Sequence, residues 1–153
     1  MAPSIQLALS LAASAALIGI AVAQPVAEGG RKFDIALNGA SECNASGTCN
    51  LGDPDGTGTA HIVLNYGQGR ICWELTVRNI DTATAAHIHR APAGIAGPVV
   101  VPLVPPPSGG SSSNCTEVNR ELIKDIIQHP QAFYVNVHNA PYPAGAVRGQ
   151  LAK

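Results

Sequence analysis

Residues 70–79, RICWELTVRN, alternate apolar and polar side chains as far as Arg78. One set of alternate positions is apolar and consists of Ile71, Trp73, Leu75 and Val77, and the other consists of Cys72, Glu74, Thr76 and Arg78. Successive side chains of a strand point to opposite faces of a sheet, so this pattern predicts a half-buried β-strand. We then expect Cys72 on the outer face, where a covering loop that carries Cys115 could reach it.

Six further runs rich in Val, Ile, Thr and aromatic residues are separated by Gly, Pro, Asn and Asp, a pattern typical of a β protein. They are residues 33–37, 59–65, 85–89, 98–103, 133–138 and 146–151. Their spacing predicts an all-β fold, an antiparallel β-sandwich or Greek-key barrel of immunoglobulin-like or superoxide-dismutase-like type. In residues 133–138 the alternation directs three side chains to the core and three outward, the outward ones being Tyr134, Asn136 and His138.

One short helix is expected to interrupt the strands. Residues 114–117, NCTE, resemble a capping box, and an apolar stripe follows at Val118, Leu122 and Ile126. The helix should end before Pro130, because proline removes a backbone donor. Residues 105–113, PPPSGGSSS, predict an exposed connector of low complexity.

The N-terminal segment has the pattern of a secretory signal peptide. Residues 1–23 carry no charged side chain, and an Ala-rich apolar run ends in AVA, a small-residue cleavage pattern. We therefore predict a signal peptide over 1–23, with an uncleaved anchor as the alternative, and one domain over 24–153. Location outside the cell is expected, or in the periplasm if the source is bacterial.

The charge balance bears on the class of partner. The formal net charge is −1 and no basic block occurs, which disfavours nucleic acid and an anionic membrane surface. We expect an extracellular protein or ligand as partner, and no membrane contact beyond the signal peptide.

Four cysteines behind a signal peptide predict disulfides. Of the three possible pairings we favour Cys43 with Cys49, which enclose a turn-rich segment, and this leaves Cys72 with Cys115. A zinc site built from cysteines is the alternative, but no CxxC pair is present.

Two blocks carry a family resemblance. Residues 86–103, AHIHRAPAGIAGPVVVPL, and 134–151, YVNVHNAPYPAGAVRGQL, resemble the chordin-type (CHRD) domain in its HIH, GPVVV, YVNVH and RGQ elements. The resemblance extends more loosely to the upstream strands and covers essentially all of the chain after the signal peptide. It implies a small secreted single-domain β-sandwich, and it implies no catalytic residue.

The histidines are the strongest candidates for chemistry. His87 and His89 should share the outer face of one strand, and His138 should lie on the outer face of another. If these strands are neighbours, three imidazoles form a cluster that suits copper, zinc or another transition metal. The alternative is a hydrogen-bonded polar layer with a purely structural role. His61 and His129 are expected to be ordinary surface residues.

These observations leave two functions open. The favoured one is a non-enzymatic binding or structural module, with an exposed contact patch around the histidine end formed by Arg90, Tyr134, Tyr142 and Arg148. The alternative is a copper-binding or other metal-binding protein, with superoxide-dismutase-like chemistry as its enzymatic version and Arg148 as a guide for the anion.

Overall fold

The computed structural model describes residues 29–107 and 110–152. The signal peptide predicted over 1–23 lies outside the described residues. The strands are β1 (Arg31–Asn38), β2 (Thr57–Asn65), β3 (Arg70–Arg78), β4 (Ala83–Arg90), β5 (Val99–Leu103), β6 (Ser111–Glu117), β7 (Phe133–Asn139) and β8 (Val147–Gln150). One α-helix, α1 (Arg120–Gln128), and two short 3-10 helices, η1 (Gly39–Ser41) and η2 (Pro130–Ala132), complete the described elements. No helix in these ranges has the length and apolar character needed to cross a membrane.

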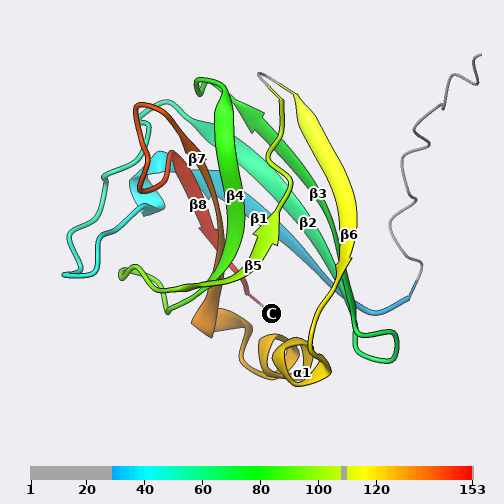
Figure 1. The fold of residues 1–153 in the computed structure, drawn as a ribbon. Helices are drawn as coiled ribbons and strands as arrows, with labels where there is room; N and C mark the ends of the chain where they lie inside the picture. The colour runs from blue at the N-terminus through cyan, green and yellow to red at the C-terminus, as the bar shows by residue number, and fades with distance from the viewer. Residues whose placement is uncertain (1–28, 108–109, 153) are drawn as a thin grey trace, which may run out of the picture.

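The strands form one antiparallel sheet in the order β5-β4-β7-β8-β1-β2-β3-β6. The sheet curls until its two edges approach each other, giving a nearly closed barrel with α1 at one end (Figure 1). Near the gap, the hydroxyl of Ser112 donates to the Val104 carbonyl at 2.7 Å. The predicted all-β class with one short helix is confirmed.

The core follows the predicted alternation. The four apolar side chains of β3 are at most 2% exposed, and those of β7 are fully buried. The other face of β7 is also covered, since all seven residues of this strand are buried. Tyr134, Asn136 and His138 therefore point away from the core but not into solvent, because loops pack over the outside of the barrel here.

The region before the helix differs from the prediction. Residues 114–117 do not begin a helix but belong to β6, which pairs with β3 from Arg70 to Thr76. The helix starts later, and its N-cap is Asn119, whose side-chain oxygen accepts from the Glu121 amide at 2.8 Å. The predicted connector is also shorter, because β6 already begins at Ser111.

Both predicted disulfides are present. Cys72 lies directly opposite Cys115 in the β3–β6 register, and a disulfide joins them. Cys115 thus comes from a paired strand and not from a loop, and Cys72 is 1% exposed. Cys43 and Cys49 form an isolated β-bridge and a second disulfide that closes a short loop.

Candidate functional site: a three-histidine cluster

The three histidines meet on the outer side of the barrel wall. Strands β4 and β7 are hydrogen-bonded neighbours, with His87 opposite Asn136 and His89 opposite Tyr134. The two strands that carry the histidines are therefore neighbours, as a three-histidine cluster requires. One ligand nitrogen from each of His87, His89 and His138 lies within 4.8 Å of the other two. Nδ1 of His87 is 3.0 Å from Nε2 of His138.

Backbone carbonyls orient two of the three rings. Nδ1 of His89 donates to the Gly97 carbonyl at 2.8 Å, and Nδ1 of His138 donates to the Pro143 carbonyl at 3.1 Å. A carbonyl only accepts, so Nδ1 carries the proton in both rings and Nε2 is the acceptor nitrogen. Nε2 of His89 has no hydrogen-bond partner within the described residues, whereas Nε2 of His138 accepts from Nδ1 of His87. Metal-binding histidines are commonly held by such a hydrogen bond from the nitrogen opposite the metal.

The cluster lies in surroundings that keep the rings uncharged. Burial, and then the neighbouring His138 and His89, lower the pKa of the half-buried His87 to about 4. Burial also lowers the pKa of His89 and His138, each of which is 8% exposed. Neutral imidazole is the form that binds metal, so all three side chains are in the ligand form at neutral pH.

Tyr134 packs on the ring of His89, and Arg148 packs on Tyr134. The Tyr134 ring stacks on the His89 ring with centroids 4.8 Å apart, and the Arg148 guanidinium lies 3.4 Å from the Tyr134 centroid. Tyr134 also accepts a hydrogen bond from the Gly97 amide at 3.3 Å. Tyr134 therefore stacks on the His89 ring and also holds Gly97, whose carbonyl orients that ring.

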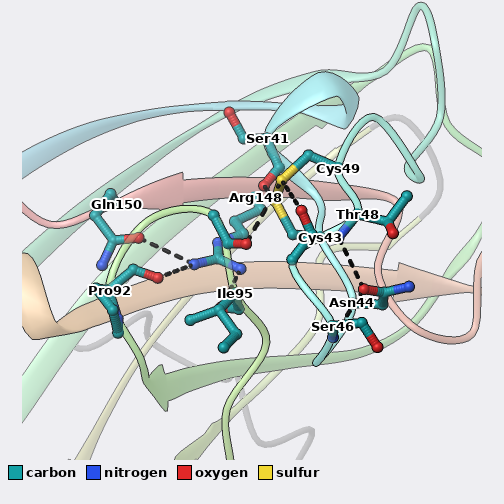
Figure 2. The surroundings of a disulfide bond; sticks show 12 residues. Ser41, Cys43, Asn44, Ser46, Thr48, Cys49, Pro92, Ile95, Arg148 and Gln150 are labelled. Atoms are coloured by element: carbon teal, nitrogen blue, oxygen red, sulfur yellow. Dashed lines mark hydrogen bonds between the residues drawn. A yellow bond between two sulfur atoms is a disulfide. The ribbon is translucent and has the colours of Figure 1, made fainter.

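Arg148 holds the loop of residues 91–97 that follows β4 (Figure 2). Its guanidinium donates to the carbonyls of Ile95 at 2.9 Å and Pro92 at 3.0 Å, and to the side-chain oxygen of Gln150 at 3.1 Å. The Cys43–Cys49 loop adds a further contact, because the Ala96 amide donates to the Asn44 carbonyl at 3.1 Å.

The predicted contact patch is only partly accessible. Tyr134 and Arg148 are 2% and 1% exposed, so their expected exposure is wrong. Alternation placed them correctly outside the core, but the loops that pack over the barrel wall cover them. Arg90 is exposed, pairs with Asp125 and lies over the Phe133 ring. Tyr142 is half-buried.

Sequence reasoning missed Glu42, and it placed Asn136 on the outward face of its strand without predicting the burial of this side chain. Glu42 follows η1 and is 4% exposed, and Asn136 is 1% exposed. Three buried atoms here have no hydrogen-bond partner within the described residues, namely Glu42 Oε1, Asn136 Oδ1 and His89 Nε2. The irregular segment around Glu42 has no periodicity that could have predicted its burial.

The buried carboxyl of Glu42 predicts a pH effect on stability. Burial raises the pKa of Glu42 from 4.5 to about 7, against smaller lowering effects of Arg148 and of the neighbouring Asn136 side chain. A raised carboxyl pKa means that its contribution to stability is complete below pH 4.5 and is lost as the pH rises through 7. Between pH 4.5 and 8, the wild type should therefore lose about 3 kcal/mol of unfolding free energy relative to Glu42→Gln.

Urea unfolding of both proteins at the two pH values measures this difference. The comparison with Glu42→Gln cancels the opposite effect of the histidines, whose lowered pKa values favour the folded state as the pH rises. Parallel pH curves for the two proteins would contradict the burial argument.

Comparison with known proteins adds a family to this geometry. The family model described as the CHRD domain matches residues 33–151. The matched segment includes the three histidines, Glu42 and Arg148. No curated protein and no solved structure matches the chain.

Proposed function

The chain belongs to the CHRD-domain family. We propose that it is a non-enzymatic module of this family that binds a transition-metal ion through His87, His89 and His138. The observation that carries this proposal is the convergence of three ligand nitrogens within 4.8 Å. The unpartnered, buried Nε2 of His89 supports it further, because a buried acceptor without a partner is costly unless something fills that role.

The chemistry of the three ligands favours copper or zinc. Imidazole nitrogen suits copper, zinc, iron and nickel, and three histidines with neutral rings resemble the ligand sets of zinc and copper proteins. We further propose that the protein works outside the cytoplasm, because its two disulfides fit an oxidising compartment.

A redox enzyme is a weaker interpretation of the same cluster. The expected guide for an anionic substrate, Arg148, is buried, and its guanidinium is directed at two backbone carbonyls and Gln150. We also propose, as a second function, the binding of an extracellular partner. Of the contact patch predicted from the sequence, Arg90 and Tyr142 are the accessible residues.

Metal loading tests the proposal. The protein without a His-tag is incubated with Zn²⁺ or Cu²⁺, freed of excess ions, and its bound metal is measured by mass spectrometry. We expect about one ion per chain in the wild type and a loss of most of that metal in the double variant His87→Ala, His89→Ala, because one remaining imidazole binds weakly.

The other two histidines provide a matched control. His61, which pairs with Asp34, and His129, which contacts Asp125 at the end of α1, lie outside the cluster. The double variant His61→Ala, His129→Ala should bind as much metal as the wild type. Equally negligible metal in the wild type and in the cluster variant would leave the histidines with a structural role only, as a hydrogen-bonded layer that fixes two loops.

A further inference from the structure

We propose that Glu42 determines the charge class of the metal ion at the histidine cluster and makes the site prefer a divalent ion to a monovalent one. This inference rests on the proposed metal-binding function. In this proposal Glu42 does not bind the ion directly. Its buried negative charge compensates the charge of the ion.

The backbone holds Glu42 firmly in place. Its amide donates to the Gly39 carbonyl at 3.1 Å, and its own carbonyl accepts from the Leu51 amide at 3.2 Å. A disulfide joins the next residue, Cys43, to Cys49 and closes a short loop. The main chain of Glu42, from which the carboxyl group extends, is therefore fixed.

The loop that covers Glu42 also orients a histidine. Gly145 lies against the carboxyl group so closely that a Cβ atom at this position would overlap it, and its φ of +145° is itself unfavourable for other residues. The same loop contains Pro143, whose carbonyl accepts from His138. One segment thus contacts both Glu42 and a histidine of the cluster.

Asn136 connects Glu42 with His89. Asn136 lies opposite His87 in the β4–β7 register and opposite Arg148 in the β7–β8 register. Its side chain lies near both the Glu42 carboxyl and the His89 ring, and it leaves Glu42 Oε1 and His89 Nε2 without a hydrogen-bond partner. Each of the three residues Glu42, Asn136 and His89 carries one of the buried atoms without a hydrogen-bond partner described above. A positive ion at His89 would therefore lie one side chain away from the carboxyl group.

The charge balance of this region explains why a carboxyl group matters. Arg148 from β8 is positive and its charge lowers the pKa of Glu42, whereas Asn136 of β7 and His89 of β4 are uncharged. Within the described residues, Glu42 is the only buried carboxyl group. Coulomb energy is proportional to the charge of the ion, so a carboxylate stabilises a divalent ion about twice as strongly as a monovalent ion at the same position.

Isothermal titration of the untagged protein with Zn²⁺ and with Ag⁺ tests this assignment. Both ions have filled d shells and no redox chemistry under these conditions, and a chloride-free buffer at pH 7.5 keeps Ag⁺ in solution. The proteins compared are the wild type, Glu42→Gln, Glu42→Asp and Glu74→Gln. Glu74 is an exposed carboxylate on β3, so its variant removes the same charge from a distant surface.

We expect Glu42→Gln to weaken Zn²⁺ binding by about 10- to 100-fold, as removal of a residue that supports a metal site typically does. Ag⁺ binding should weaken only by about the square root of that factor, roughly 3- to 10-fold. Glu42→Asp, which keeps the charge, should stay closer to the wild-type ratio of the two affinities, and Glu74→Gln should change neither affinity. Glu42→Gln should fold, because the wild-type carboxyl is itself partly neutral near pH 7.

The possible failures are distinguishable. Equal losses of Zn²⁺ and Ag⁺ affinity in Glu42→Gln would mean that Glu42 only shapes the site, and unchanged affinities would remove it from the site altogether. In both cases the proposed function stands, because the wild type binds metal. A wild type that binds neither ion would overturn the proposed function and, with it, the role of Glu42.

Discussion

Replacing Arg148 by methionine is expected to lower the free energy of unfolding by about 3–5 kcal/mol, the size found when one partner of a buried charged group is removed. Methionine keeps much of the side-chain volume but has no donors. It would leave the carbonyls of Pro92 and Ile95 without the hydrogen bonds that Arg148 supplies, and it would remove the cation that stacks on Tyr134. Each buried polar group that loses its partner costs about 1–3 kcal/mol.

Urea unfolding at pH 7 measures this loss, with Arg90→Met as the control. Arg90 also pairs with a carboxylate and lies over an aromatic ring, but its side chain is 45% exposed. An exposed ion pair is typically worth no more than about 1 kcal/mol. If the two variants lost similar amounts, Arg148 would not be the residue that holds the 91–97 loop.

Removing the Cys72–Cys115 disulfide by the double substitution to serine should cost about 4 kcal/mol. In the chain-entropy account, a disulfide restricts the unfolded chain in proportion to the logarithm of the loop that it closes. This bridge closes a separation of 43 residues, whereas Cys43–Cys49 closes one of 6. The same calculation gives about 2 kcal/mol for the shorter loop.

Thermal or urea unfolding of the two double-serine variants, prepared side by side, compares the bridges directly. The longer loop should show the larger loss. A larger loss for Cys43–Cys49 would contradict the entropic ranking, and would indicate that the contacts of its loop with residues 91–97 dominate its contribution.

The strands with regular alternation were predictable, and β6 was not. RICWELTVRN predicts β3 because apolar and polar residues follow each other with the period of a strand. The sequence of β6, SSSNCTE, has no apolar face, and its first four residues, three serines and an asparagine, are typical of turns. It forms a strand because β3 offers a free edge and Cys115 lies opposite Cys72, and both are tertiary facts.

The histidine cluster was predictable as a set of residues, but its surroundings were not. Alternation puts His87, His89 and His138 on the outer side of their strands, and only the β4–β7 pairing brings them together. The burial of Tyr134 and Arg148 depends on loops that fold back over the barrel wall, and such loops have no periodic pattern. The burial of Glu42 was not predictable for the same reason.

X-ray absorption at the zinc edge of the zinc-loaded wild type shows directly whether the three histidines hold the ion. We expect three nitrogen ligands at about 2.0–2.1 Å, with the multiple scattering of imidazole rings. The spectrum should lose imidazole ligands in the His87→Ala, His89→Ala variant. A wild-type spectrum with oxygen ligands only, or one unchanged in this variant, would show that the three histidines do not hold the metal.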